Sequence, residues 1–224
     1  VLVQRGVTEP DEVEKFLNPK LDDMHDPFLL KDMDLAVNRI REAFLHQEGI
    51  LVCGDYDVDG ITSVALLKRA LPGNGAEIHT YLPNRLSEGY GFHEYSVNYA
   101  RDLGAKLMIT VDCGITSRDT VEYAKQFGIE TIITDHHEQN GPLPNATAIL
   151  NPKREDSTYP DGNLAGIGVA FKFVHALINA KLLRFPITAM LELVALGTVA
   201  DVANLTGENR IFVYHGLQAL THTS

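Results

Sequence analysis

The chain has 224 residues, of which 45% are hydrophobic and 22% are charged, a composition typical of a folded protein with a substantial core. Its formal net charge of −11 argues against nucleic-acid binding by bulk electrostatic attraction alone. No apolar run is long enough to span a membrane, and two cysteines, Cys53 and Cys113, are too few for a disulfide framework. We therefore expect a cytoplasmic protein with buried thiols and no membrane contact.

The first 49 residues predict helices rather than strands. Thr8, followed by a proline, indicates the start of a helix that reaches Leu17. Residues 18–30 contain two prolines and predict an irregular connector. Asp32 is expected to cap a second helix, which ends near Gly49. We expect residues 1–49 to form a helical lead-in to a catalytic domain at 50–224.

From residue 50 onward, short apolar runs alternate with stretches in which apolar residues recur at helical spacing. The expected strands cover residues 50–53, 77–82, 106–111, 130–134 and 148–150, and the expected helices between them cover 61–71, 94–103 and 117–127. This alternation predicts an α/β fold with an open, mostly parallel sheet and helices on both faces. A polar loop follows, and residues 164–183, 187–200 and 209–220 predict a helical C-terminal part whose first two helices are largely buried.

Three acidic residues follow the first expected strand. Asp55, Asp57 and Asp59 stand at alternate positions between a buried strand and a helix, where they would repel one another unless a cation neutralises them. The alternative is a solvated acidic turn, with Asp59 near a helix N-terminus that favours a carboxylate anyway.

Acidic residues and histidines also follow two later strands. Asp112 comes after the strand at 106–111, and Asp135, His136 and His137 come after the strand at 130–134. Because the carboxyl ends of parallel strands meet at one edge of a sheet, we expect these residues to join the first three acids there. Carboxylates mixed with imidazole suit Mn²⁺, Zn²⁺ or iron better than a carboxylate-only Mg²⁺ site. A carboxylate shared by two such ions is a common arrangement for hydrolysing phosphate esters.

Two further segments carry candidate site residues. In the loop that follows residue 82, Arg85 would hold a phosphate bidentately and Tyr90 would stack on a base; the alternative is a turn with a surface arginine. Asp201 ends a strongly apolar helix, and a charge in such a place needs a partner. A metal ion would be such a partner for Asp201, and the alternative is that Asp201 caps the helix.

The chain also carries four short motifs in order, namely GDYDVDG at 54–60, VDCG at 111–114, DHH at 135–137 and GTVADV at 197–202. Together they resemble the motifs of the DHH phosphoesterases. The loop at 83–91 and the segments at 165–172 and 207–210 resemble the RecJ branch of that family, which consists of exonucleases specific for single strands. The resemblance extends from about residue 7 to about residue 216. Each motif is weak by itself, and the combination in this order is specific.

The resemblance implies a metal-dependent phosphodiesterase that degrades single-stranded DNA from the 5′ end, releases nucleoside 5′-monophosphates, and acts in DNA repair and recombination. It implies two divalent metal ions, with Mn²⁺ preferred or Mg²⁺ in its place. Asp57 and Asp59 would bind one ion each, and Asp112 would bridge the two. His136 and Asp201 would complete the site held by Asp59.

The remaining roles follow from the same resemblance. Asp55 would be a further metal ligand, or would contact the ligands without binding the metal itself. His137 would contact the scissile phosphate and stabilise the charge of the transition state, acting in catalysis beside Asp112 and His136. Arg85 and Tyr90 would hold the DNA strand near the cleaved bond.

The sequence departs from the family pattern in two ways, one at the first metal site and one in the length of the chain. Cys53 stands where some DHH enzymes, such as the manganese pyrophosphatases, have a histidine ligand; we expect buried packing, with a thiolate ligand as the alternative. RecJ-like proteins carry a DHH-associated domain and often an oligonucleotide-binding fold after this region. We therefore expect the chain to be a catalytic core, whose missing parts provide the basic strand-binding surface and any contact with a single-strand-binding protein or a helicase.

Two other functions stay open at this point. One is a DHH phosphatase that acts on small nucleotides, short oligonucleotides or pyrophosphate; Cys53 argues against it. The other is a non-catalytic DHH-like scaffold; the presence of every motif acid argues against it. The sequence indicates no oligomeric state.

Overall fold

One five-stranded sheet forms the centre of the computed structural model, which describes residues 2, 4 and 7–222. The strand order is β2-β1-β3-β4-β5, and all four neighbouring pairs are parallel. The strands are β1 (Gly49–Gly54), β2 (Glu77–Tyr81), β3 (Leu107–Val111), β4 (Glu130–Thr134) and β5 (Ala148–Leu150). The predicted α/β fold is confirmed, and the sheet is parallel throughout.

The strands are apolar along their length because both faces of the sheet are covered. In β1, Ile50 and Val52 point into one hydrophobic core, while Leu51 and Cys53 point into the other. This is the alternation expected of a strand, in which successive side chains leave opposite faces. The two cores fix the strand register, because a slip of one residue would exchange their contents.

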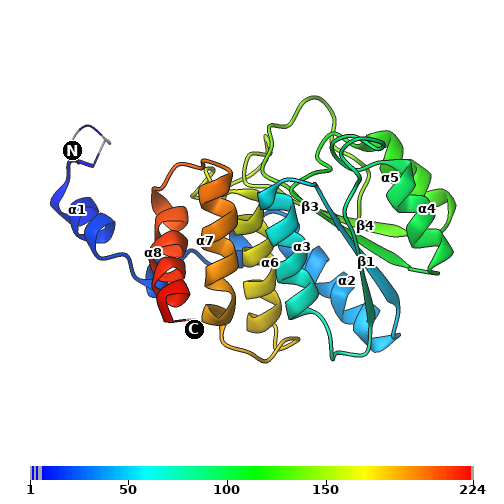
Figure 1. Cartoon of the computed structure of the whole chain (residues 1–224), viewed down its shortest axis with the longest axis horizontal. Coiled ribbons are helices and arrows are strands. Elements are labelled where there is room, and N and C mark those ends of the chain that lie inside the picture. The colour runs from blue at the N-terminus through cyan, green and yellow to red at the C-terminus, as the bar shows by residue number, and fades with distance from the viewer. Residues whose placement is uncertain (1, 3, 5–6, 223–224) are drawn as a thin grey trace.

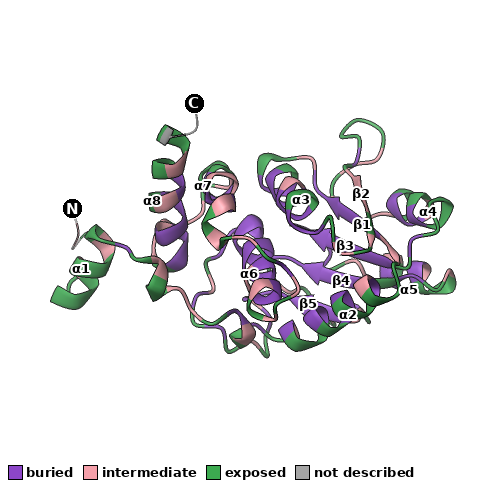
Figure 2. Cartoon of the chain, turned by 90° about the horizontal axis from the view of Figure 1, so that it is seen from below, coloured by how far each residue is buried: buried purple, intermediate pink, exposed green. Residues whose placement is uncertain are grey.

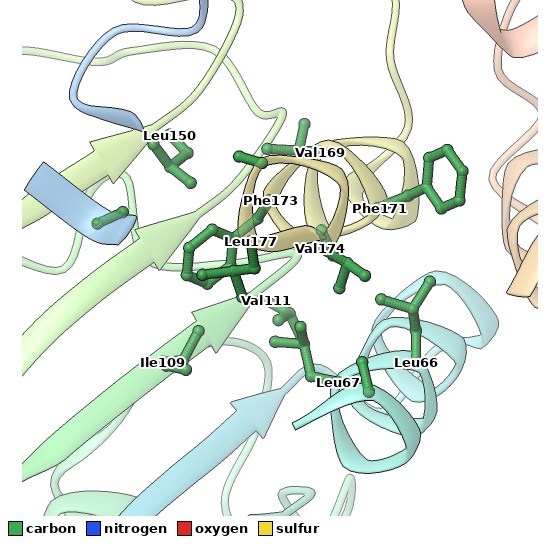
Figure 3. Close-up of a cluster of buried hydrophobic side chains, with 14 of the residues drawn as sticks. Leu66, Leu67, Ile109, Val111, Leu150, Val169, Phe171, Phe173, Val174 and Leu177 are labelled. Atoms are coloured by element: carbon green, nitrogen blue, oxygen red, sulfur yellow. The ribbon is translucent and has the colours of Figure 1, made fainter. Parts of the chain in front are cut away.

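Helices from both halves of the chain cover the two faces (Figure 1). The larger core lies under α2 (Met33–Leu45), α3 (Val58–Ala70) and α6 (Gly166–Asn179). The smaller core lies under α4 (Glu94–Asp102) and α5 (Arg118–Gln126). Figure 3 shows part of the larger core, in which α3 and α6 bring Leu67 and Phe173 toward Val111 of β3. The helix α2 belongs to this core, and the division of the chain at residue 50 stays a prediction.

The C-terminal helices extend the larger layer away from the sheet. The helix α7 (Leu191–Ala200) packs on α3, and α8 (Gly207–His222) packs on α7. The helix predicted at 187–200 is in fact a short 3-10 turn, η4 (Ile187–Met190), followed by α7. The prediction that both helices are largely buried holds for α6, and for α7 it holds only in part, because half of its residues are buried. Part of the surface of α7 is exposed (Figure 2), because the helix has neighbours on only part of its circumference. Leu196 and Val199 are 51% and 50% exposed.

The N-terminal segment departs from the sequence expectations at its helix caps. The helix α1 (Pro10–Leu17) begins after Glu9, which forms a capping box with Glu12, so Thr8 is not the cap. The connector contains two 3-10 turns, η2 (Leu21–Asp23) and η3 (Pro27–Leu29). Asp32 precedes α2 but does not cap it. Its carboxylate instead accepts hydrogen bonds from Arg154 and from the backbone of Ile149, both near the end of β5.

A buried ion pair joins α6 to α8. Lys172 and Glu208 are 0% and 1% exposed, and their charged atoms lie 2.7 Å apart. Glu208 also accepts hydrogen bonds from the backbone of His25, at 3.0 Å, and from the hydroxyl of Tyr159. The pair therefore fastens the C-terminal helix to the connector before α2 and to the centre of the domain. None of the helices that the structure describes has the length and apolar character needed to cross a membrane.

Removing Lys172 alone should therefore be costly. The substitution Lys172→Met leaves Glu208 buried without its cation, and we expect it to lower the free energy of unfolding by about 3 kcal/mol. The control is Lys125→Met, which removes an exposed ion pair on α5 and should change stability by less than about 0.5 kcal/mol. Urea denaturation followed by circular dichroism measures both, and equal effects would contradict the structural role given to Lys172.

His175 on α6 predicts a dependence of stability on pH. Its Nδ1 has no hydrogen-bond partner among the described residues, and burial, followed by the charge of Lys172, lowers its pKa from 6.5 to about 4. Between these values the unfolded chain binds a proton that the native chain does not, so stability falls as the pH falls from about 6.5 toward about 4. We expect His175→Gln to flatten that dependence in denaturation curves recorded across this range, and an unchanged slope would argue against it.

Candidate metal centre

The turn after β1 places its acids in three different environments. Asp55 is fully buried, and its Oδ1 accepts the backbone N–H of Tyr56 at 2.7 Å. Asp57 is exposed and caps α3, because its carboxylate accepts the backbone N–H of Gly60 at 2.9 Å. The turn is tight enough that a Cβ at Gly60 would lie 2.5 Å from the carbonyl oxygen of Asp55. Only glycine therefore fits at the end of this motif.

Asp59 lies in the first turn of α3, but its side chain serves a different helix. Its two carboxylate oxygens accept the backbone N–H groups of Gly166 and Ile167, each at 2.7 Å, at the N-terminus of α6. Burial raises the pKa of Asp59 to about 6, against the opposing influence of His136 and the two N–H donors. The alternative of a solvated acidic turn is wrong, since both Asp55 and Asp59 are buried.

Asp112 occupies the centre of the group directly after β3. Its φ of 57° is left-handed, and its backbone N–H continues the sheet by bonding to Thr134 at 2.9 Å. The side chain is buried, and neither carboxylate oxygen has a hydrogen bond to any residue that the structure describes. Burial, followed by the charges of Asp59 and Asp57, raises the pKa of Asp112 to about 10. A carboxylate that is buried without hydrogen-bond donors is ionised at low cost only when a cation lies beside it.

His136 lies between the acids of three segments. Its Nε2 is 3.1 Å from an oxygen of Asp112, without hydrogen-bond geometry, and 3.9 Å from an oxygen of Asp59. Its Nδ1 is 3.9 Å from an oxygen of Asp201. Two sets of potential ligand atoms result, each within 4.8 Å of one another: Asp59, His136 and Asp201, and Asp112, His136 and His137. Oxygen and imidazole ligands around orphaned carboxylates fit divalent metal ions.

His137 is held at both of its ring nitrogens. Its Nδ1 is 2.7 Å from Asp135, and its Nε2 is 3.0 Å from the hydroxyl of Tyr90. The hydrogen bond to Asp135 raises the pKa of His137 to about 9, although burial opposes it. Asp135 is itself buried, and it also accepts the backbone N–H of Ile115 at 2.8 Å. Burial alone would raise the pKa of Asp135, and its hydrogen bonds, chiefly that with His137, bring it below the usual value.

The loop between β2 and α4 reaches this edge through aromatic residues. The half-exposed ring of Tyr90 meets His137 edge to face, with ring centres 6.1 Å apart. Arg85 lies farther out, its guanidinium carbon 5.4 Å from the ring centre of Tyr56, which in turn contacts Tyr90. The structure thus connects both predicted substrate-binding residues to the metal edge, Tyr90 directly and Arg85 through Tyr56.

The structure brings the predicted metal ligands to one edge of the sheet. Asp55 and Asp57 fall outside the two closest ligand sets. Burial is the main cause that raises the pKa of Asp55 and of Asp112, and the charge of Asp57 adds to it in both cases. Cys53 lies in the smaller core among apolar residues, and burial raises the pKa of its thiol to about 12. The prediction of buried packing for Cys53 is confirmed.

Two residues of this centre received no role from the sequence analysis. Asp135 was expected at this edge of the sheet, and the structure adds that it orients His137. Gly166 begins α6 against the centre, where an added Cβ would lie 2.6 Å from an oxygen of Asp112. No local pattern in the sequence reports that contact, because the two residues are far apart along the chain.

Comparison with known proteins identifies this arrangement. Residues 49–198 match the model of the DHH family, N-terminal domain. The chain belongs to the DHH family. The curated relatives include the single-stranded-DNA-specific exonucleases RecJ of Bacillus subtilis (strain 168) and Escherichia coli (strain K12). They are 41% identical over 224 residues and 39% identical over 227 residues. The resemblance to the RecJ branch is confirmed.

The structural comparison agrees with this membership. The crystal structure of RecJ from Thermus thermophilus in complex with Mn²⁺ has a TM-score of 0.80 and 32% sequence identity, and it matches 100% of this chain and 31% of that one. The alignments cover 100% and 96% of this chain, and 28% and 39% of the Bacillus and Escherichia proteins. The DHH chain described here therefore spans between about a quarter and two fifths of these relatives.

The contact between Gly166 and Asp112 gives a test of how tightly this DHH centre is built. Gly166→Ala should displace the carboxylate of Asp112 and lower the affinity for Mn²⁺ about 10- to 100-fold, as is usual when the support of a ligand is disturbed. Gly168→Ala is the matched control, because a Cβ two residues along the same helix makes ordinary contacts with Leu164 and Phe212. Titration calorimetry with MnCl₂ measures both affinities, and equal values for the two variants would refute the proposed constraint.

Proposed function

We propose that this chain is the catalytic domain of a metal-dependent phosphodiesterase that removes nucleoside 5′-monophosphates from the 5′ end of single-stranded DNA. The observation that carries the proposal is the buried carboxylate of Asp112, which has no hydrogen bond to a described residue and lies 3.1 Å from His136 at the edge where the strands end. Similarity to exonucleases described as specific for single-stranded DNA supports the choice of substrate.

Two divalent ions, Mn²⁺ by preference or Mg²⁺, fit the residues present. Asp59, His136 and Asp201 would hold one ion, and Asp57, with Asp55 beside it, would hold the other. Asp112 would lie between them, since both of its oxygens are free of hydrogen bonds to described residues. When bound, such ions acidify a water molecule and neutralise the charge that develops on a phosphate.

The remaining residues would bind and orient the phosphate. The hydrogen bond to Asp135 raises the pKa of His137 to about 9, which favours the protonated ring, and its Nε2–H would donate to a phosphate oxygen as negative charge develops there. Asp135 keeps the ring in the required orientation. Arg85 has no hydrogen bond or ion pair with another described residue, so its N–H donors are available to a phosphate oxygen.

The same proposal extends to the cellular setting. Similarity to exonucleases that act on single-stranded DNA supports a cytoplasmic enzyme with a part in repair and recombination. The net charge of −11 does not exclude a DNA strand as substrate, because it includes acidic residues that would bind metal and would not be free to repel a polyanion.

The direct test is cleavage of a single strand labelled at either end, with Mn²⁺, with Mg²⁺ and with a chelator. We expect metal-dependent release of mononucleotides from the 5′ end only. Asp112→Ala should abolish cleavage and lower Mn²⁺ affinity together, because the same carboxylate serves both. Asp119→Asn, an exposed acid on α5, is the control and should leave both unchanged. Turnover retained in Asp112→Ala would refute the two-metal proposal.

The same assay separates the competing functions. A rate on a dinucleotide or pyrophosphate that exceeds the rate on a long strand would favour a small-substrate phosphatase. Absence of both cleavage and metal binding would favour a non-catalytic scaffold.

A further inference from the structure

We propose that Tyr56 is a positioning residue, which holds Arg85 and Tyr90 at the metal edge and so sets the affinity for the DNA strand. The inference rests on the proposed function and adds a residue to which neither the sequence motifs nor the family resemblance gave a role. Tyr56 separates Asp55 from Asp57 in the first motif. Its ring contacts Arg85 and Tyr90, which belong to the loop between β2 and α4, and does not face the candidate metal ligands.

The ring of Tyr56 contacts both residues that are expected to hold the strand. It meets Tyr90 edge to face, with ring centres 6.0 Å apart and planes at 87°. The guanidinium carbon of Arg85 lies 5.4 Å from its centre, within cation–π range. The backbone beneath the ring is fixed, because the N–H of Tyr56 donates to the buried carboxylate of Asp55 at 2.7 Å. Tyr56 therefore offers a rigid support to two side chains that are themselves largely exposed.

Arg85 depends on this support more than on any other group. It makes no hydrogen bond and no ion pair with the residues that the structure describes, and Leu86 beside it is 97% exposed. The loop is anchored farther along by Glu88, which accepts hydrogen bonds from the hydroxyl of Tyr81 and the backbone of Asn84 at 2.6 and 3.1 Å. Among the described residues, the ring of Tyr56 is the group that contacts the guanidinium of Arg85 and restricts its motion.

Electrostatics explain why an aromatic ring is suited to this task. A salt bridge between the guanidinium and a carboxylate would occupy the donors that a phosphate needs. The face of Tyr56 attracts the cation without using its N–H groups, which leaves them in the plane that a phosphate approaches. Ordering Arg85 before the strand arrives also reduces the entropy lost on binding.

The contacts continue from Tyr56 into the catalytic group. Tyr90 is fixed on its other side by the 3.0 Å contact of its hydroxyl with His137, which is held by buried Asp135. Loss of the Tyr56 ring should thus loosen Arg85 completely and Tyr90 in part. The metal ligands should stay in place, because no metal-ligand contact among the described residues involves this ring.

The experiment measures strand binding by the full chain with Ca²⁺ in place of Mn²⁺, using a short 5′-phosphorylated oligothymidine that carries fluorescein at its 3′ end. We expect Tyr56→Leu to weaken binding about tenfold. Tyr56→Phe should bind within about twofold of the unsubstituted chain, because the hydroxyl of Tyr56 has no hydrogen bond to a described residue. Tyr214→Leu is the control: this exposed tyrosine on α8 also meets another ring, that of His215, and its loss should leave binding unchanged.

Two further readouts separate positioning from a general effect on the fold. Mn²⁺ affinity and the thermal unfolding midpoint should be the same in Tyr56→Leu and the unsubstituted chain. The losses of affinity in Tyr56→Leu and Arg85→Ala should fail to add in the double variant, because both act through one guanidinium.

Three results would overturn the proposal: unchanged binding in Tyr56→Leu, an equal loss in Tyr56→Phe, or fully additive losses in the double variant. Failure of the proposed function has a different signature, in which the unsubstituted chain binds Mn²⁺ but no strand. The proposal for Tyr56 then falls with it, since there is no strand to position.

Discussion

The central constraint on this fold is the burial of carboxylates that have too few partners. Asp55, Asp59 and Asp112 are each at most 1% exposed, and they meet at the edge where parallel strands end. Taking such groups out of water is costly unless a cation or hydrogen-bond donors compensate. Backbone N–H groups do so for Asp59, but three oxygens of Asp55 and Asp112 have no such partner among the described residues. The fold thus holds a site that is complete only with cations.

The helices outside the sheet can be understood from this constraint. The N-terminus of α6 bonds to Asp59, Gly166 leaves room for Asp112, and the C-terminus of α7 supplies Asp201. The buried pair Lys172–Glu208 then fastens α8 to α6. The C-terminal helices consequently contribute to the candidate metal centre as much as the sheet does. Their disturbance should reach the chemistry through Asp59 and Asp201.

The sheet and the edge at which the candidate ligands meet could be predicted from sequence, whereas the contacts that support them could not. Apolar runs flanked by acids identify strands and their ends, and the topology of a parallel sheet then brings Asp112 and His136 to one edge. The bond from Gly166 to Asp59 joins residues 107 positions apart, and the bond from Arg154 to Asp32 joins residues 122 positions apart. No local pattern encodes such pairs. The exposure of α7 was missed for a related reason, since an apolar composition does not reveal how many neighbours a helix has.

The proposed phosphodiesterase activity requires two cations bound side by side between these acids. A crystal grown with Mn²⁺ tests this most directly. Anomalous scattering at the manganese edge locates each ion without reference to the protein. We predict two peaks about 3.5–4 Å apart, with Asp112 between them, His136 and Asp201 on the ion beside Asp59, and Asp57 on the other. A single peak, or two peaks that share no carboxylate, would contradict the account.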